Sequence, residues 1–338
     1  MKIEFDHRQA AHCETGVTSS LLKYAGIDKM TEPLAFGIGA GLFYVHIPFI
    51  KINNGPAIAF RTLPGWIFSK TCHSLDIPVI RKKFGSKEAA ASFLDNCLEN
   101  GQPAGCQVGV YYLSYFPKEY RFHFNAHNII VFGKEEDRYL ISDPIMETPT
   151  SLTSYELERV RFAKGALAPR GQIYYPKEKV IITDQQLKKA IRSGINRNVR
   201  NMLHIPGRIA GVNGIRYTGQ KIKKWRDKLG LSKAGLYLAQ LVRMQEEIGT
   251  GGGGFRYIYG AFLQEAYAYY PNDQLLEISK LFTQAGDAWR TAAIQAAGIY
   301  KGRIGSQADF NVMGDYLLEI SELERQAFGA LSKIKWHS

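Results

Sequence analysis

The spacing of apolar residues divides the chain into two parts that meet near residue 178. In the first part, short runs rich in β-branched and aromatic residues predict strands at 107–115, 126–133, 138–142 and 172–175. One helix is also expected there, over 14–25, because Gly26 follows it as a stop signal.

The second part has the spacing of amphipathic helices. Thr183 and Gln186 predict a capping box. Apolar residues then recur every four positions, at Leu187, Ile191, Ile195, Val199 and Leu203. Further helices are expected at about 234–248, 256–269, 274–299 and 310–333. The glycine-rich segment 249–254 lacks the GK[ST] ending of a phosphate loop, so we interpret it as a helix cap and a flexible joint.

The length of 338 residues suits about two domains. We therefore predict an α+β domain over 1–178 and an all-α domain over 179–338, with a short proline-and-charge linker at Pro176–Lys179.

Composition narrows the class of protein. Hydrophobic residues make up 45% of the chain and charged residues 22%, as in an ordinary folded protein. Its cysteines, Cys13, Cys72, Cys97 and Cys106, show no CxxC spacing and indicate reduced thiols inside a cell. The opening MKIEFDHRQ has no signal-peptide core, and the longest uncharged run, Pro33–Ile50, is at the lower limit for a membrane span. We expect a cytoplasmic protein with no membrane span and, without HExxH or zinc-like spacing, no metal site.

Positive charge is concentrated in one segment, 183–233. The formal net charge is +12, and this segment holds 13 basic residues against two acidic ones. Such a segment favours an acidic partner, with a merely solvated helix face as the alternative. The basic residues are Lys188, Lys189, Arg192, Arg197, Arg200, Arg208, Arg216, Lys221, Lys223, Lys224, Arg226, Lys228 and Lys233.

Cys13 is the first candidate for chemistry. Its place at the predicted start of the helix puts the thiol where the helix dipole favours a thiolate and where backbone amides are unpaired. A thiolate there is a competent nucleophile, and the free amides can hold an oxyanion. Glu14 adds a like charge that opposes this effect. The alternative is a buried, inert cysteine.

His127 and Asp143 are the second candidate pair. If 133–137 forms a five-residue hairpin loop, Phe132 faces Arg138 and His127 lies directly opposite Asp143. The carboxylate would orient the imidazole and leave its other nitrogen for a thiol. A purely structural ion pair is the alternative. The order Cys, His, Asp is the one that a papain-like fold requires, so the three together favour catalysis.

The same segments resemble a known family. HRQAAHCETGVTSSLLKYAGI, followed by EPLAFGIGAGLFY, resembles the opening of the butirosin-biosynthesis protein H N-terminal family. VYYLSYFPKEYRFHFNAHNIIVFG and YLISDP resemble its central strands and catalytic hairpin. EEIGTGGGGFRYIYGAFLQEA resembles the helical domain that commonly follows it.

This resemblance implies a papain-like, bacteriocin-peptidase-like fold and an acyltransferase. It makes Cys13 the nucleophile, His127 the general base and acid, and Asp143 the orienting carboxylate. His7 and Gln9 are both candidates for the oxyanion donor that precedes the nucleophile in such folds. Where the family usually has an acidic residue before YYL, this chain has Gly109, which leaves the acceptor open.

The resemblance also implies the partners. The acyl donor would be a thioester on the phosphopantetheine arm of an acidic acyl carrier protein, with no cofactor bound by the enzyme itself, and the acceptor an amine or hydroxyl of a small molecule. Acyl-cysteine would be the intermediate in biosynthesis of a secondary metabolite or lipid. Lys221, Lys223 and Lys224 are the candidates for docking the carrier protein.

Two other functions remain open. The same three residues would serve a papain-like cysteine peptidase or amidase, in which water accepts the acyl group. A non-catalytic protein could instead bind nucleic acid through the basic segment, but its only aromatic residues are Tyr217 and Trp225, and it lacks DNA-binding motifs. The aromatic residues Tyr111, Tyr112, Tyr115 and Phe116 are expected in the core, with an acyl pocket as the alternative.

Overall fold

A computed structural model describes residues 1–52 and 55–336, which form two compact units. The sheet unit consists of Met1–Ala35 and Ile67–Thr183. The helical unit consists of Phe36–Trp66 and the chain from Asp184 onward. The chain therefore has the expected α+β part and α-helical part, but each unit is built from separate stretches of sequence.

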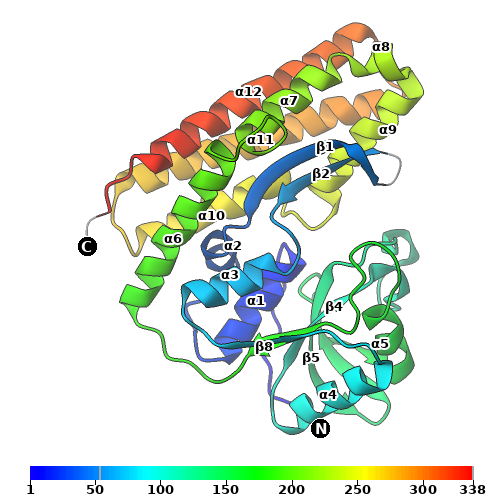
Figure 1. Cartoon of the computed structure of the whole chain (residues 1–338), viewed down its shortest axis with the longest axis vertical. Helices are drawn as coiled ribbons and strands as arrows, with labels where there is room; N and C mark the ends of the chain where they lie inside the picture. Colours follow the sequence, from blue (N-terminus) through cyan, green and yellow to red (C-terminus); the bar gives the residue numbers. More distant parts are fainter. Residues whose placement is uncertain (53–54, 337–338) are drawn as a thin grey trace. The chain divides into compact units, whose positions relative to one another are not determined.

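The sheet unit is built on six antiparallel strands (Figure 1). Their order is β3 (Val79–Lys82), β8 (Ile173–Pro176), β4 (Ala104–Val108), β5 (His127–Glu135), β6 (Arg138–Ser142) and β7 (Thr150–Thr153). The helices are α1 (Cys13–Tyr24), α3 (Trp66–Ser74), α4 (Lys87–Glu99) and α5 (Ser154–Arg161).

Strand β5 lies at the centre of this unit. Its first seven residues are buried, which fits a near-continuous run of Ile and Val rather than alternation with polar residues. Ile129 and Val131 belong to a core shared with Leu98 of α4 and Leu157 of α5. Helix α1 also packs against β5. The strand that begins with His127 is therefore held by several layers of apolar side chains.

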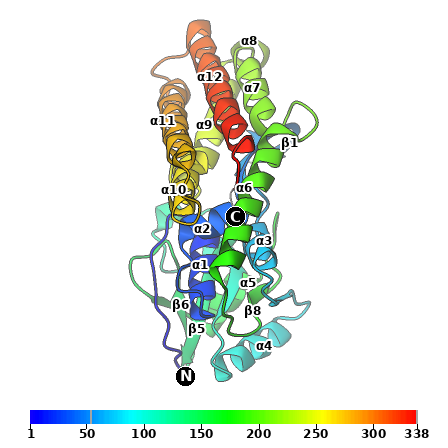
Figure 2. The same cartoon turned by 90° about the vertical axis from the view of Figure 1, so that its left-hand side faces the viewer.

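The helical unit contains seven α-helices among its described residues. They are α6 (Asp184–Leu203), α7 (Gly211–Ile222), α8 (Trp225–Leu229), α9 (Leu231–Val242), α10 (Arg256–Tyr267), α11 (Asp273–Tyr300) and α12 (Gln307–Ser332). The long helices α11 and α12 run side by side in both views (Figures 1 and 2). The hairpin of β1 (Leu42–Ile52) and β2 (Gly55–Arg61) completes the unit, and α2 (Glu32–Ile38) lies where the chain passes from one unit to the other.

The predicted domain division is wrong for residues 36–66, which were assigned to the first domain. Tyr44 and Phe60 of the hairpin pack on Trp289 of α11, with ring centroids 5.8 and 4.9 Å away. The Tyr44 hydroxyl donates a hydrogen bond to Thr218 of α7. The apolar face of this hairpin thus finds its partners in helices that come much later in the sequence. The second boundary falls at Thr183, shortly after the expected linker.

Most of the other elements follow the sequence pattern. The expected helix at 14–25 and the four helices beyond residue 234 are confirmed, and so are the strands at 126–133, 138–142 and 172–175. The strand predicted at 107–115 is wrong beyond its first two residues: β4 runs over Ala104–Val108, and Val110–Tyr112 forms a 3-10 turn. The expectation of one helix in the first part is wrong, because helices α2, α3, α4 and α5 also form there. The pattern also did not reveal the strands β1, β2, β3 and β7 or the helices α7 and α8.

The glycine-rich segment 249–254 is a compact turn, not the expected flexible joint. Gly252, Gly253 and Gly254 are buried and have positive φ. A Cβ atom at Gly254 would lie 2.4 Å from the ring of Phe60, and one at Gly253 would lie 2.8 Å from the backbone of Gly286. Only glycine combines this backbone conformation with so close an approach.

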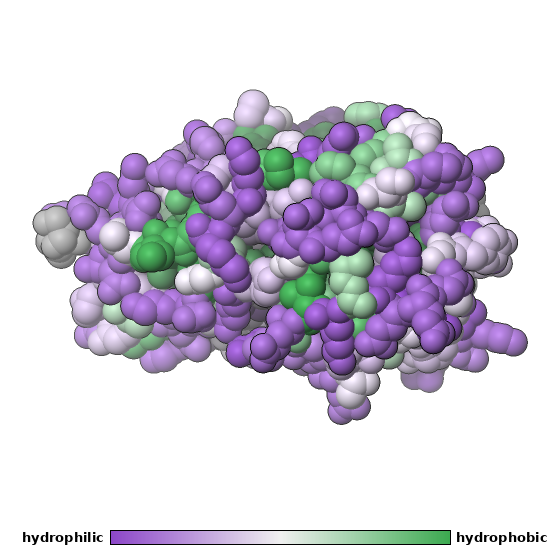
Figure 3. Space-filling view, turned by 90° about the horizontal axis from the view of Figure 1, so that it is seen from below, coloured by the Kyte–Doolittle hydropathy of each residue, from purple (hydrophilic) through white to green (hydrophobic). Residues whose placement is uncertain are grey.

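The surface is mostly hydrophilic on the face shown in Figure 3, where hydrophobic residues gather only in small, separate patches. Within residues 1–52 and 55–336, no helix is long and apolar enough to cross a membrane.

A buried ion pair fixes the centre of the helical unit. Arg256 of α10 donates to both carboxylate oxygens of Glu324 in α12, at 2.8 and 2.9 Å, and both side chains are fully buried. Trp289 of α11 donates to the same carboxylate at 2.8 Å. Three helices are therefore joined at one charge pair, and removal of either partner leaves the other charge buried and unpaired.

Glu324→Ala is expected to lower the free energy of unfolding by about 3–5 kcal/mol, because it isolates the Arg256 guanidinium. Glu322→Ala is the matched control. Its carboxylate is half-exposed and 3.9 Å from Arg325, so its loss is expected to cost less than about 1 kcal/mol. Urea unfolding of both variants measures the difference, and equal losses would contradict the assigned role of the buried pair.

Candidate active site

Cys13 is the first residue of α1, as predicted. The N-cap is His12, whose Nδ1 accepts a hydrogen bond from the backbone N–H of Thr15 at 3.4 Å. The carboxylate of Glu32 accepts from the backbone N–H groups of Ala11 and His12, at 3.0 and 2.8 Å. These contacts fix the backbone immediately before the thiol, while the first-turn amides of α1 have no intrahelical acceptor.

The Glu14 carboxylate, which was expected to oppose a negative charge at Cys13, has a hydrogen-bond partner in another helix. Its carboxylate is fully buried and accepts a hydrogen bond from the backbone N–H of Ile67, in the first turn of α3, at 2.9 Å. A helix N-terminus favours a negative charge. The charge next to Cys13 therefore has a partner of its own at α3.

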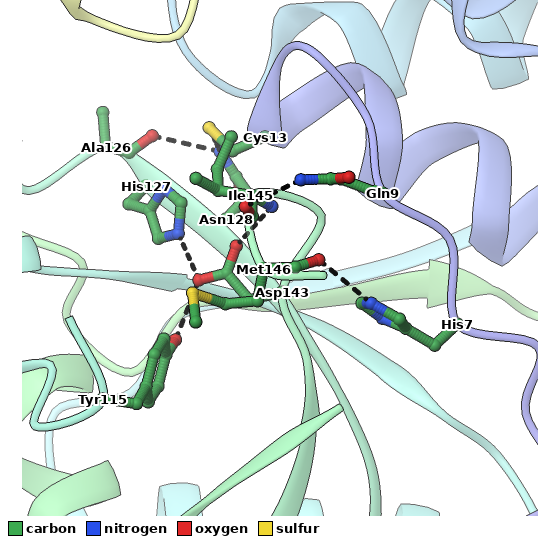
Figure 4. Close-up of polar contacts among 10 residues, drawn as sticks. All are labelled: His7, Gln9, Cys13, Tyr115, Ala126, His127, Asn128, Asp143, Ile145 and Met146. Carbon is green, nitrogen blue, oxygen red and sulfur yellow. Dashed lines mark hydrogen bonds and ion pairs between the residues drawn. The ribbon is translucent and has the colours of Figure 1, made fainter. Parts of the chain in front are cut away.

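His127 and Asp143 form a buried ion pair (Figure 4). His127 Nε2 donates to Asp143 Oδ2 at 2.7 Å, and the side chains are 6% and 0% exposed. Because a carboxylate only accepts, Nε2 carries a proton, and Nδ1 is the ring nitrogen left for another partner. His127 also interacts electrostatically with Cys13.

The predicted route to this pair is wrong, although the pair forms. Strands β5 and β6 are joined by a tight turn at Glu136 and Asp137, since Glu135 pairs with Arg138. A register shift between Val131 and Gly133 adds a further residue to β5, and Val131 then pairs with Ile141. Continued to the end of β6, this register places Asp143 diagonally across from His127, not opposite it. The side chains still meet because diagonal neighbours on one face lie within reach.

The Asp143 carboxylate is satisfied by three donors. Besides His127, the Tyr115 hydroxyl donates to Oδ2 at 2.8 Å and the backbone N–H of Ile145 donates to Oδ1 at 3.0 Å. Burial and the charge of Asp143 raise the pKa of Tyr115 well above its usual value, so the phenol stays a donor. The sequence analysis considered Tyr115 only for packing or an acyl pocket. Its contact depends on the 3-10 turn that replaces the predicted strand end, which the strand-like spacing concealed.

The protonated state of His127 is favoured by its partners. Burial alone lowers the pKa of the imidazole, but attraction to Asp143 and to Cys13 outweighs this effect and raises the pKa to about 10 from the usual 6.5. The thiol, the imidazole and the carboxylate are therefore arranged as a cysteine–histidine pair with an orienting carboxylate.

Gly16 lets α1 approach this pair closely. A Cβ atom at Gly16 would lie 2.6 Å from Cβ of Pro144, the residue after Asp143, and 2.7 Å from Cβ of Ala10. The backbone N–H of Ala10 donates to the carbonyl of Pro144 at 2.8 Å. The first turn of α1 is thereby attached to the segment that holds the carboxylate.

The two oxyanion candidates differ in their contacts. His7 uses both ring nitrogens in other contacts: its Nδ1 lies 2.8 Å from Ser142 Oγ. Its Nε2 lies 3.1 Å from the carbonyl oxygen of Met146 (Figure 4). Gln9 is exposed, and its amide donates to the carbonyl of Ile145 in a long contact of 3.5 Å. The structure does not bring His7 to the thiol.

Asn128 is a neighbour of the thiol that the sequence analysis missed. Its Nδ2 lies 3.9 Å from Cys13 Sγ and 3.0 Å from the carbonyl of Ala126 (Figure 4). The Tyr174 hydroxyl donates to its Oδ1 at 2.8 Å and so fixes the orientation of the amide. Its position next to His127 in sequence was the available signal.

The other cysteines lie in the core. Burial raises the pKa of Cys72, Cys97 and Cys106, so each remains a thiol. Within the described part of the chain, no group of three or more His, Cys, Asp or Glu residues could hold a metal ion.

The candidate docking lysines lie in the helical unit, where they differ in environment. Lys223 forms an ion pair with Asp315 of α12. Lys221 stacks on the ring of Tyr217, with Nζ 5.1 Å from its centroid, and Lys224 is exposed. Charge at Lys223 is therefore partly neutralised, and Lys221 and Lys224 are the stronger candidates.

Comparison with known families agrees with the resemblance seen in the sequence. Residues 12–144 match the family described as butirosin biosynthesis protein H, N-terminal. Residues 155–331, just over half of the chain, match a second family, a domain of unknown function, DUF4872. The chain belongs to this second family, and its first part is similar to the butirosin protein H family.

Comparison with individual proteins adds less. No curated protein matches the chain. Among solved structures, a putative C39-like peptidase from Bacillus anthracis is similar at 14% identity and a TM-score of 0.37, covering 53% of this chain and 100% of its own.

Gly109 lies where there is no room for a side chain. A Cβ atom there would lie 2.5 Å from Cβ of Ala163 and 2.7 Å from Oδ1 of Asn125. The Asn125 amide is itself bonded to the carbonyls of Lys164 and Ala166. A side chain at position 109 would therefore displace an anchored loop.

Iodoacetamide at neutral pH is expected to modify Cys13 before the other cysteines, because burial raises the pKa of Cys72, Cys97 and Cys106 and keeps each of them a thiol. His127→Ala should slow this modification about tenfold or more. Peptide mass spectrometry over time measures both rates. Equal rates at Cys13 and Cys72, or no effect of the substitution, would contradict the assigned pair.

The stability of the fold should depend on pH through His127. Because its folded-state pKa of about 10 exceeds the usual 6.5, its contribution is complete below pH 6.5 and is lost as the pH rises through about 10. The free energy of unfolding of the wild type, minus that of His127→Gln, should therefore decrease from pH 6.5 to 10. Urea unfolding at a series of pH values measures this difference, which would stay constant if His127 were neutral in the fold.

Proposed function

We propose that the protein is an acyltransferase that moves an acyl group from a pantetheine thioester, through an acyl-cysteine at Cys13, to an amine or hydroxyl. The observation that carries the proposal is the joint position of Cys13, His127 and Asp143, in a chain whose residues 12–144 match the butirosin biosynthesis protein H family. That family's name points to biosynthesis, in which acyl groups are commonly activated as thioesters.

The first half-reaction forms the acyl-enzyme. The Cys13 thiolate attacks the thioester carbonyl, and a bond forms between Sγ and the acyl carbon. The bond from that carbon to the pantetheine sulfur breaks, and the His127 imidazolium protonates the departing thiolate. Asp143 keeps the ring oriented throughout through the 2.7 Å bond to Nε2.

The second half-reaction releases the product. His127, now neutral, accepts the proton of the incoming amine or hydroxyl as it attacks the acyl carbon. The bond to Sγ then breaks and restores the thiolate. One thioester is exchanged for another in the first step, so no ATP is required.

Oxyanion stabilisation is assigned to donors near the thiol. The backbone N–H of Cys13 is one of the first-turn amides of α1. The side-chain amide of Asn128, 3.9 Å from Sγ, and that of Gln9 are the candidate second donors. Tyr115 is a positioning residue, since it contacts Asp143 and not the thiol.

Docking of an acidic carrier protein is assigned to the basic residues of the helical unit, with Lys221 and Lys224 as the main contacts and Lys223 as a weaker one. Attraction of this kind raises the association rate and weakens with salt. The carrier protein would bring its own phosphopantetheine, so the enzyme itself would need no cofactor. A cysteine hydrolase uses the same residues and differs only in taking water as the acceptor.

Incubation with an acyl-pantetheine thioester, without acceptor, is expected to increase the intact mass by one acyl group at Cys13. Cys13→Ala should show no increase, whereas Cys72→Ala, which removes a core thiol of the same unit, should be acylated normally. Addition of amines then decides between transfer and hydrolysis: an amide product supports the proposal, and free acid in their presence supports the hydrolase.

The same assay tests docking. With a carrier-bound donor, Lys221→Glu together with Lys224→Glu should slow acylation and reduce its salt dependence, while acylation by free acyl-pantetheine stays unchanged. If no thioester acylates Cys13, the proposed reaction is wrong. If acylation occurs but charge reversal has no effect, only the docking surface is wrong.

A further inference from the structure

The helical unit contains a cavity of about 220 Å³ that the proposed active site does not use. It lies between the hairpin β1–β2 and helices α7, α8 and α9. All its lining residues belong to the helical unit. Pockets for drug-sized ligands measure about 300–1,000 Å³, so this one suits a smaller molecule.

The walls of this cavity are largely aromatic. Trp225 packs edge-on against Tyr237, with ring centroids 5.3 Å apart and planes at 89°. Tyr217 forms another wall, 5.7 Å from the ring of His46. Pro48 and Pro56 of the hairpin complete the apolar lining. Rings held at such angles suit a flat, apolar ligand body.

Four lysines also line the cavity, and no acidic residue does: they are Lys51, Lys221, Lys224 and Lys228. Among the described residues, none of the four forms an ion pair with a carboxylate. Lys51 donates to the Tyr237 hydroxyl at 2.8 Å and to the carbonyl of Pro48 at 3.0 Å, so its ammonium group is held at the wall. Four positive charges around one small cavity attract an anion, and most strongly one that carries more than one negative charge.

His46 supplies a hydrogen-bond acceptor to the same cavity. The Tyr44 hydroxyl donates to Thr218 Oγ1, and Thr218 donates to the carbonyl of Gly214, each at 2.8 Å. Thr218 can therefore only accept from His46 Nδ1, 2.9 Å away, so the proton lies on Nδ1 and Nε2 is an acceptor. The ring is 1% exposed, and Nε2 bonds to none of the described residues.

The imidazole also stays neutral. Burial is the main cause that lowers the pKa of His46, to about 4, and the charges of Lys51 and Lys221 add to it. The cavity thus combines a neutral acceptor, aromatic walls and several unpaired ammonium groups.

We propose that this cavity binds a small aromatic phosphomonoester that carries a hydroxyl group. The phosphate dianion would meet the lysines, the ring would lie between the aromatic walls, and the hydroxyl would donate to His46 Nε2. This site contains none of Cys13, His127 and Asp143, so its chemistry is separate from the proposed acyl transfer, although Lys221 and Lys224 also belong to the proposed docking surface.

Titration calorimetry with 4-hydroxyphenyl phosphate is the direct test. It should bind at least about tenfold more tightly than inorganic phosphate, which lacks the ring, and than hydroquinone, which lacks the charge. Phenyl phosphate, which lacks only the hydroxyl, should bind less tightly than 4-hydroxyphenyl phosphate and more tightly than inorganic phosphate or hydroquinone. Lys221→Gln and Lys228→Gln should each weaken binding about tenfold.

Lys233→Gln is the matched control, because it removes the same charge from the same basic segment but does not line the cavity. Its affinity should stay within about twofold of the wild type. Equal weakening by Lys233→Gln, or equal affinity for inorganic phosphate, would show general attraction of anions and overturn the proposal. Equal affinity for hydroquinone would show an apolar cavity without phosphate recognition and would also overturn it. Thermal unfolding confirms that each variant is folded.

Discussion

The burial of one carboxylate is the constraint on which the candidate active site depends. Asp143 is fully buried, and a buried charge is tolerated only where hydrogen bonds and an opposite charge compensate for lost water. Three elements supply that compensation: β5 through His127, the 3-10 turn region through Tyr115, and the turn after β6 through Ile145. The imidazole is thereby held in one orientation and kept charged. The thiol at α1 needs both of these properties if it is to act as a nucleophile.

The two units contain different kinds of chemistry. The sheet unit holds the His127–Asp143 ion pair beside Cys13, with opposite charges that balance within the site. The helical unit holds an internally balanced pair, Arg256–Glu324, but also a set of lysines without carboxylate partners around a cavity. Balanced charge is typical of structure or of a preformed catalytic group, whereas unbalanced charge indicates that something outside the chain completes it. The excess of basic residues in the second half is thus partly structural and partly available to a ligand or partner.

The sequence was sufficient where the controlling interactions are local. Cys13 at the start of a helix follows from a helical run that Gly26 ends, and the His127–Asp143 pair follows from two strand-like runs. The predicted register of β5 against β6 was wrong, because no local sequence signal distinguishes a five-residue loop from a tight turn followed by a bulge. Tyr115, Asn128 and Glu32 were missed as contacts of the site, since their partners lie far away in sequence. The hairpin 36–66 was assigned to the wrong unit for the same reason: its partners, Trp289 and Thr218, are determined by tertiary packing.

That hairpin has a consequence for how the protein is made. A ribosome completes Phe36–Trp66 early, before any of the sheet unit beyond it, yet the helices that cover its apolar side chains are synthesised last. Until then Tyr44 and Phe60 contact each other but lack their later partner Trp289, and a nascent chain with an exposed apolar hairpin is prone to misassembly. Truncation at the end of the first family domain would leave this hairpin permanently uncovered. The two halves of the chain therefore depend on each other for folding. A recombination event that exchanged only one half of the gene would separate the hairpin from the helices that cover it.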